Sequence, residues 1–415
     1  MPRTSVHKIK YVAASFLLIL CCLASCTSCG TAGESGPLSP LVSVDPGQPS
    51  SPTQTSTDVS ATDILPESPV TEDDPTPSDL PEPPEPAKDP ETVAPIVDTA
   101  DVAYSYGDLC EDLLQLSQRY PGIFSYETIG KSVDGRDLFA ARIGSPSAPR
   151  VIVVAAGMHA REYMAVSLVM GQTEYYLSHY DEALYQGNTY RAVFDACAVV
   201  LLPMLNPDGV MLCQEGIGAM QNAASVAAVN GVYRSDYAAG LISNYSLETY
   251  LRTSYKANVN GVDLNRNYPA GWEPYHKMMK PSLKNYKGRT AASEPETQAV
   301  MAYLSALTGA EALLSVHTQG NVIYWDCGQT GELRSENLEL AESVAALTGY
   351  NCIDEQNNDA SLTDWAVLAL GIPALTLEVG VGTKYPLDHT QLPVALAQNL
   401  DVWPAVAFDC GIARP

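Results

Sequence analysis

The sequence predicts an α/β domain with a mixed, mostly parallel central sheet and helices on both faces. Four short runs consist mainly of apolar residues, as expected for central strands that are buried on both faces. These runs are residues 151–156, 198–202, 313–316 and 374–379. Longer amphipathic stretches alternate with the runs, which is the pattern of a sheet covered by helices. We assign all these segments to a single domain, residues 101–415.

The first 25 residues predict a signal peptide of the lipoprotein type. A short basic start precedes an apolar run, residues 11–24, which is shorter than the roughly 20 residues of a membrane-spanning helix. The run ends in Leu-Ala-Ser before Cys26, which resembles the bacterial lipobox. We therefore expect cleavage before Cys26, a lipid anchor on this cysteine, and a location on the outer face of the cytoplasmic membrane in a bacterial cell envelope. An ordinary signal peptide is the alternative.

Residues 26–100 predict an extended, solvated tether. Within them, residues 31–100 contain 15 of the 30 prolines, 14 acidic residues, one lysine and no aromatic residue, so they cannot form a hydrophobic core. The whole chain carries a formal net charge of −25. Such an acidic chain argues against nucleic acid as a partner, because phosphate binding needs clustered Lys and Arg.

Turn and capping signals define the other elements of the domain. Pro121-Gly122 ends a helix predicted over 106–120, and Asp134-Gly135 joins two predicted strands, 124–129 and 138–143, in a hairpin. Further helices are predicted over 162–176, 295–307, 336–348 and 393–406. Ser293-Glu294-Pro295-Glu296 predicts a capping box at the start of the second of these. The remaining stretch, residues 211–260, predicts loops and short helices.

The first sign of chemistry is a histidine and a glutamate just after the first apolar run. His159 and Glu162 are three residues apart, so both side chains can point to one spot beyond the strand, where imidazole and carboxylate suit Zn²⁺. The pair is weak evidence by itself. A second such pair, His179 and Glu182, follows a predicted helix among charged residues, and we interpret it as surface.

Further polar clusters follow the other predicted strands. His317 comes directly after the third apolar run, and Glu378 lies at the end of the fourth. A third cluster contains Asp263, Asn265 and Arg266. Active sites of open α/β sheets gather at the carboxyl ends of strands, so these side chains are expected to meet. An ionised glutamate that closes a buried strand is costly unless it has a functional partner.

With these clusters in this order, residues 101–410 resemble the metallocarboxypeptidases of the zinc carboxypeptidase A superfamily. The resemblance implies the fold of that superfamily and peptide hydrolysis with one Zn²⁺ per chain. Residues 317–325, together with 286–288 and 293–297, are most similar to the bacterial branch that cleaves γ-D-glutamyl-diamino acid bonds in peptidoglycan peptides.

The resemblance also implies a role for each matching residue. Three residues match the zinc ligands: His159, Glu162 and His317. Asp263 matches the carboxylate that orients a ligand histidine. Glu378 matches the general base, which takes a proton from the attacking water and passes it to the leaving amine. Asn265 and Arg266 match the pair that grips the terminal carboxylate of the substrate.

Two positions depart from the family's pattern. Where the family has an arginine that steadies the oxyanion, this chain has Lys256, and Arg252 one helical turn earlier is a rival for that role. Where many relatives have a mobile tyrosine, this chain has Gln356, and Tyr350 is a possible substitute. Both alternatives stay open at the level of sequence.

The leading functional hypothesis is a lipid-anchored zinc peptidase that cleaves the γ-D-glutamyl-diamino acid bond of peptidoglycan stem peptides. The expected partner is thus a peptide or muropeptide substrate. An exopeptidase that removes C-terminal residues from ordinary peptides is the alternative, and a catalytically silent envelope binding protein is a third. The acidic stretch 354–363 would suit the side-chain ammonium of a diamino acid, with Asp359 either as its partner or simply solvated.

Overall fold

A mixed sheet of eight strands carries the domain, in the order β1-β2-β6-β3-β7-β10-β8-β9. The four apolar runs form its centre as β6 (Cys197–Leu202), β3 (Arg150–Ala155), β7 (Ala310–His317) and β10 (Ala374–Glu378). Each pairs in parallel with its neighbour, so their carboxyl ends share one edge of the sheet. The predicted mixed, mostly parallel sheet is confirmed.

The computed structural model describes residues 94–413, apart from 244–245, 355 and 357–358. The predicted signal peptide, Cys26 and nearly all of the predicted tether lie outside the described residues. Within the described ranges, no helix has both the length and the hydrophobicity that crossing a membrane requires.

Antiparallel strands extend the sheet on both sides of the parallel centre. The predicted hairpin is present as β1 (Phe124–Lys131) and β2 (Asp137–Ile143), with Gly135 in the turn at a φ of 95° that suits glycine. The other side consists of β8 (Val322–Tyr324), antiparallel to β10, and β9 (Asn351–Ile353). A separate two-stranded sheet contains β4 (Leu184–Tyr185) and β5 (Asn188–Thr189).

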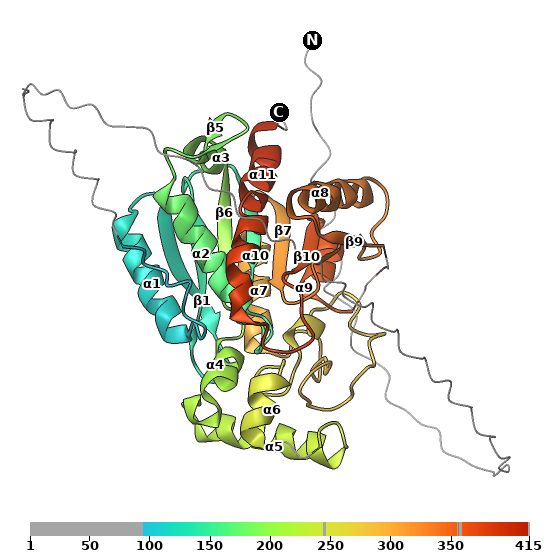
Figure 1. Ribbon diagram of the computed structural model, residues 1–415. Coiled ribbons are helices and arrows are strands. Elements are labelled where there is room, and N and C mark those ends of the chain that lie inside the picture. Colours follow the sequence, from blue (N-terminus) through green and yellow to red (C-terminus); the bar gives the residue numbers. More distant parts are fainter. Residues whose placement is uncertain (1–93, 244–245, 355, 357–358, 414–415) are drawn as a thin grey trace, which may run out of the picture. The chain divides into compact units, whose positions relative to one another are not determined.

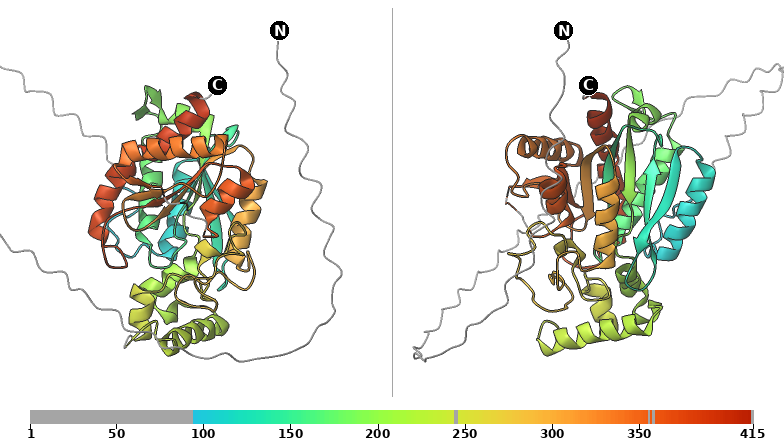
Figure 2. Two further views of the ribbon diagram at one scale, coloured as in Figure 1. Left: turned by 90° about the vertical axis from the view of Figure 1, so that its right-hand side faces the viewer. Right: turned by 180° about the vertical axis from the view of Figure 1, so that it is seen from behind.

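Helices cover both faces of the sheet, as Figures 1 and 2 show. One face packs against α1 (Tyr106–Arg119), α2 (Met164–Ser178), α3 (Tyr190–Ala196), α8 (Glu332–Thr348), α10 (Leu392–Asn399) and α11 (Val402–Phe408). The other face packs against α7 (Pro295–Ala306) and α9 (Leu362–Trp365). Alternate residues of one strand enter different cores, because Val153 faces α7 whereas Val154 faces the opposite helices.

Several predicted helix boundaries are wrong, each for a local reason. The single helix predicted over 393–406 is broken into α10 and α11, because Pro404 clashes with the carbonyl four residues earlier and supplies no N–H to it. That carbonyl, of Leu400, instead accepts a hydrogen bond of 2.6 Å from the Tyr176 hydroxyl. Helix α2 begins at Met164, which leaves Glu162 on the turn before it.

The predicted capping box at residue 293 does not form. Proline occupies the first position of α7 as expected, but the residue at the N-cap is Glu294, and its side chain does not cap the helix. The Ser293 hydroxyl donates to the Glu294 carboxylate instead, at 2.6 Å. The side chains of residues 293–294 therefore bind each other and do not cap the helix.

The stretch predicted as loops and short helices contains one longer helix. Helices α4 (Pro207–Glu215), α5 (Ala223–Ala238) and α6 (Leu247–Thr253) form a third apolar cluster, drawn at the bottom of Figure 1. Helix α5 has 16 residues but buries few large side chains, chiefly Val229 and Val232, so its amphipathic signal is weak.

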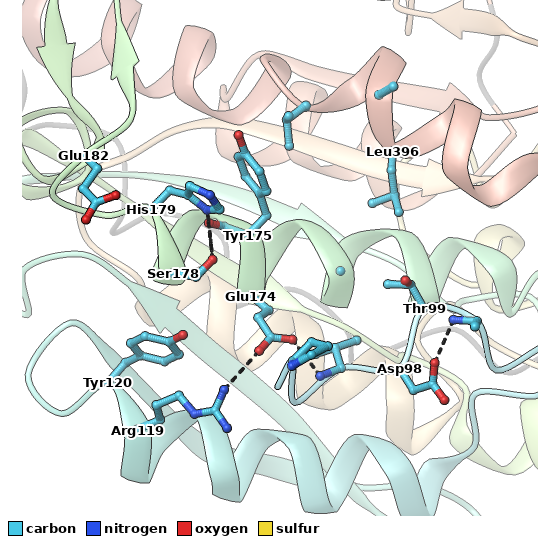
Figure 3. A pocket seen from close by; sticks show the side chains of 16 residues that line it. Asp98, Thr99, Arg119, Tyr120, Glu174, Tyr175, Ser178, His179, Glu182 and Leu396 are labelled. Atoms are coloured by element: carbon cyan, nitrogen blue, oxygen red, sulfur yellow. Dashed lines mark hydrogen bonds and ion pairs between the residues drawn. The ribbon is translucent and has the colours of Figure 1, made fainter. Parts of the chain in front are cut away.

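A buried carboxylate holds the beginning of the described chain against the domain (Figure 3). Glu174 of α2 accepts hydrogen bonds of 2.7 Å from the backbone N–H groups of Ile96 and Val97. Arg119 of α1 lies 3.5 Å from Glu174 and donates to the Ala94 carbonyl at 3.0 Å. Residues 94–100, assigned by sequence to the tether, thus lie beside a cavity of about 1060 Å³ that α1, α2 and α10 help to line.

Candidate active site

Three predicted ligands meet at the carboxyl edge of the sheet. His159 and Glu162 lie on the turn after β3, and His317 is the last residue of the neighbouring parallel strand β7. The Oε2 atom of Glu162 lies 2.9 Å from Nδ1 of His159 and 3.0 Å from Nδ1 of His317. The two Nδ1 atoms are 3.0 Å apart, and all three side chains are buried. They form a compact triangle of potential ligand atoms.

The hydrogen bonds around this triangle fit a cation at its centre. Asp263 can only accept from Nε2 of His159, at 3.2 Å, so in the neutral imidazole the Nδ1 atom presents a lone pair to Glu162. Without a cation, the lone pair on Nδ1 of His159 and the Glu162 carboxylate, which are both hydrogen-bond acceptors, would face one another inside the protein. Ligands bound at about 2.1 Å in a tetrahedral zinc site lie about 3.4 Å apart, a few tenths of an ångström beyond the 2.9–3.0 Å observed here. The donor set therefore suits zinc.

Asp263 connects the ligand group to the backbone of Asn265 and Asn285. Its carboxylate accepts from the backbone N–H groups of Asn265 and Asn285, at 3.2 and 3.0 Å, as well as from His159. Burial opposes its ionisation, but the hydrogen bond from His159 and the positive charges of Lys256 and Arg266 hold the pKa of Asp263 well below its usual range. This side chain is therefore a fixed anion that orients His159.

Glu378 lies at the end of β10, in register with His317 of β7. Burial, with the nearby charge of Glu162, raises the pKa of Glu378 to about 7. A carboxylate with a raised pKa next to a metal site can take up and release a proton near neutral pH. A metal ion held by His159, Glu162 and His317 would supply Lewis acidity beside this carboxylate.

The structure separates the two candidates for steadying the oxyanion. The Nζ atom of Lys256 lies 4.0 Å from Oε1 of Glu162, and its side chain lines the cavity beside the ligands. Arg252 instead lies on α6, where it is half exposed and pairs with Glu248 at 3.3 Å. Arg252 thus has a partner on its own helix and does not line this cavity, which favours Lys256 as the candidate.

A polar cavity of about 280 Å³ adjoins the ligands and contains the predicted substrate-binding pair. Asn265 is positioned by the Leu362 N–H, which donates to its Oδ1 at 3.1 Å. Three groups hold the Arg266 guanidinium: Tyr275 Oη at 3.1 Å, the Asn265 carbonyl at 2.7 Å and the Asp359 carboxylate at 3.2 Å. Arg266 is thus held by three groups while it lines the polar cavity.

Two other sequence expectations are corrected. Asp359 is neither free nor merely solvated, because Arg266 and Lys277 both contact its Oδ2 at 3.2 Å. Tyr350 cannot replace the missing tyrosine, since it is buried and its hydroxyl accepts from Asn399 of α10. Gln356 is exposed and lines the polar cavity.

Sequence reasoning missed Tyr385, an aromatic residue near the ligands. Tyr385 follows β10, and its ring lies over the Arg161 guanidinium, with 3.7 Å from the ring centroid to Cζ. Burial, together with the negative charges of Glu162 and Glu378, raises the pKa of Tyr385. Arg161 could have been noticed as the neighbour of Glu162, but no sequence signal pointed to Tyr385.

Comparisons with known proteins agree with this arrangement. Among curated relatives, γ-D-glutamyl-L-diamino acid endopeptidase 1 of Lysinibacillus sphaericus is 28% identical over 303 residues, which cover 72% of this chain and 71% of the relative. Thrombin activatable fibrinolysis inhibitor superposes with a TM-score of 0.58 at 16% identity, over 76% of this chain and 77% of its own. Carboxypeptidase A of Helicoverpa armigera superposes with a TM-score of 0.53 at 18% identity, over 75% and 74%.

The two superpositions show that the fold is that of metallocarboxypeptidases. The sequence profile of the zinc carboxypeptidases, peptidase family M14, matches residues 109–400. This match runs from α1 to the end of α10 and so includes every described site residue named above. With its buried His-Glu-His group, this chain belongs to the zinc carboxypeptidase family and is a zinc-dependent peptide hydrolase.

Proposed function

We propose that this enzyme hydrolyses the γ-D-glutamyl-diamino acid bond of peptidoglycan stem peptides. The observation that carries the proposal is the polar cavity next to the His-Glu-His group, with Arg266 oriented inside it. The endopeptidase from Lysinibacillus sphaericus, whose name states this bond, supports the same assignment.

The cavity suits the residue that follows the scissile bond. Arg266 and Asn265 bind its α-carboxylate, as a guanidinium fork and a nearby amide can. Hydroxyl and amide groups from Thr363, Thr376 and Gln356 line the walls, and more carboxylates than cations face the same space. A diamino acid, with a polar and positively charged side-chain end, fits such a lining better than a bulky apolar residue.

Each catalytic side chain then has one task in the hydrolysis. Glu378 takes a proton from the attacking water and delivers it to the amine that leaves. Lys256 places a positive charge where negative charge develops on the carbonyl oxygen. Asp263 keeps His159 oriented throughout.

We further propose that the enzyme acts in the bacterial envelope, held at the outer face of the cytoplasmic membrane by a lipid on Cys26. The support is the sequence alone, namely the basic start, the apolar run and Leu-Ala-Ser before the cysteine. A tether of some 70 residues would let the domain reach stem peptides away from the bilayer.

Digestion of purified muropeptides, followed by mass spectrometry, tests the substrate assignment. Tri- and tetrapeptide stems should yield fragments that end at D-glutamate, and Glu378→Gln should yield none in the same time. If the stems stay whole while unmodified peptides lose their C-terminal residues, the enzyme is an ordinary exopeptidase and the proposal is wrong.

A further inference from the structure

Two cysteines that are far apart in the sequence meet at the amino edge of the sheet. Cys197 is the first residue of β6, and Cys410 lies in the helical turn Asp409–Ala413 that follows α11. A side-chain hydrogen bond joins the two thiols, and this bond, together with burial, raises the pKa of Cys197. Both side chains are buried, and both are thiols in the structure.

The backbone around Cys410 is fixed against the sheet by contacts that do not involve the thiols. A Cβ atom on Gly411 would lie 2.9 Å from Cβ of Cys197, closer than two carbon atoms normally approach, so glycine is required here. Arg150, the first residue of β3 and the register partner of Cys197, donates from its guanidinium to the Cys410 carbonyl. Backbone packing therefore holds the two cysteines as neighbours.

The other cysteines of the described residues have partners of another kind. Their hydrogen bonds go to oxygen atoms of other residue types, and these cysteines are Cys110, Cys213, Cys327 and Cys352. Ordinary burial of a small apolar side chain accounts for them. The contact between two sulfur atoms distinguishes the pair at the amino edge of the sheet.

We propose that Cys197 and Cys410 form a disulfide when the enzyme folds under oxidising conditions, and that this bond fastens the C-terminal turn to β6. The inference rests on the proposed envelope location, because disulfides persist outside the reducing cytoplasm. One protein thiolate attacks an external disulfide of the glutathione type and releases one of its thiolates, and the second cysteine displaces the other. Two protein thiols are thereby oxidised, one external disulfide is reduced to two thiols, and both protons pass to these thiols.

Bond formation belongs to folding rather than to the folded state. A thiol with a raised pKa is seldom the reactive thiolate, and both cysteines are buried once the C-terminal turn has packed on β6. The same burial shields the finished disulfide from reductants. The folded, reduced enzyme should therefore oxidise slowly, whereas the unfolded chain should pair as it folds.

The bond should stabilise the domain without changing its chemistry. Cys197 begins β6, whereas the zinc ligands follow the carboxyl ends of β3 and β7, so the pair and the ligands lie at opposite edges of the sheet. A bond between residues 197 and 410 closes a long loop of the unfolded chain, which restricts that chain and favours the folded domain.

Peptide mapping tests the pairing. The full chain is denatured, refolded with oxidised or with reduced glutathione, alkylated in denaturant and cleaved before aspartate residues. This cleavage isolates the two cysteines in peptides 195–207 and 409–415. The oxidised sample should contain the two peptides joined to each other, and a reductant should separate them. The reduced sample should contain both peptides in alkylated form.

Thermal unfolding of cysteine variants separates the disulfide from simple packing. Wild type refolded with oxidised glutathione should melt roughly 5–10 °C above wild type refolded with reduced glutathione. Cys197→Ser and Cys410→Ser should each melt at one temperature in both buffers. Cys213→Ser is the matched control, because Cys213 is also buried but donates to the Leu251 carbonyl, and it should keep the redox-dependent shift.

The outcomes distinguish the inference from the catalytic assignment. Separate, alkylated peptides from the oxidised wild type, or a link from either cysteine to a third one, would show that the inference is wrong. Well below the melting temperature, oxidised and reduced enzyme should hydrolyse muropeptides at equal rates, since the pair lies away from the ligands. If the link forms but neither form of the enzyme cleaves muropeptides, the proposed function fails and the inference stands.

Discussion

Nε2 of His159 lies 3.2 Å from Oδ1 of Asp263, and this contact decides which nitrogen of His159 faces the zinc site. A carboxylate accepts only, so Nε2 carries the proton and Nδ1 is left with its lone pair toward Glu162. The same carboxylate accepts hydrogen bonds from the backbone N–H groups of Asn265 and Asn285. One anion therefore aligns a metal ligand with the two loops that contain these residues. Orientation of the metal site and of the loops that contain Asn265 and Asn285 is thereby coupled.

Changing Asp263 should weaken zinc binding without abolishing it. In Asp263→Asn the amide can no longer hold His159 as a carboxylate does, so zinc affinity should fall by about 10- to 100-fold. His317→Ala removes a ligand and should lose the metal while the sheet persists. Competition with a chelator, together with metal analysis and circular dichroism, checks both. Stoichiometric zinc of wild-type affinity in His317→Ala would refute the ligand assignment.

Glu378→Gln should abolish most activity while zinc stays bound. The amide keeps the shape of the side chain but cannot accept the proton of the attacking water, so kcat should fall by about 10²-fold or more. Steady-state kinetics and zinc content on the same preparation provide the measurement. Lys131→Gln, a substitution on the exposed hairpin, is a suitable control. Near-normal turnover of Glu378→Gln would rule out the general-base role.

The buried carboxyl of Glu296 should make the domain less stable as the pH rises. Burial raises the pKa of Glu296 to about 8, whereas an unfolded chain has the ordinary value near 4.5. Between these values the folded state binds more protons, so the free energy of unfolding should fall by up to about 1.4 kcal/mol per pH unit from this group. Urea unfolding at pH 5, 7 and 9 should show this trend, and Glu296→Gln should flatten it. An unchanged slope in the variant would contradict the assignment.

Glu174→Ala should release the beginning of the described chain from the domain. The Ile96 and Val97 N–H groups would lose their acceptor, and Arg119 its partner, at a cost of about 1–3 kcal/mol in unfolding free energy. Hydrogen exchange should accelerate at residues 96–97. Glu182→Ala changes an exposed carboxylate of the same cavity and should leave the exchange as in wild type. Equal exchange at residues 96–97 in the two variants would contradict the role of Glu174 in holding this segment.

Cys26→Ser tests the proposed anchor. Without the thiol no thioether lipid can form, so the protein should remain uncleaved or pass from the membrane fraction into the medium. Fractionation with metabolic labelling by a fatty acid gives the readout. Unchanged labelling and membrane association of Cys26→Ser would show that Cys26 is not the anchor.

The strands and the metal group could be predicted because both depend on local sequence. Runs such as 151–156 and 198–202 are apolar on both faces, which is sufficient to place them in the centre of a sheet. Parallel neighbours end at one edge, so residues at strand ends, such as His159 and His317, meet without any knowledge of the loops. Helix ends were less predictable where competing groups decided them, as at Pro404.

The sequence by itself determined the fold class, the family resemblance and the identity of the chemical groups at the strand ends. Only the tertiary structure decided which cation lies beside the metal group. The backbone N–H of Lys256 donates to the carbonyl of Leu283 and its side chain reaches Glu162, whereas Arg252 pairs with Glu248 on its own helix. The partners of Asp359, the remote position of Tyr350 and the stacking of Tyr385 on Arg161 likewise depend on loops that approach over long sequence separations. Periodicity reports which face of a segment is buried, but not which distant segment covers it.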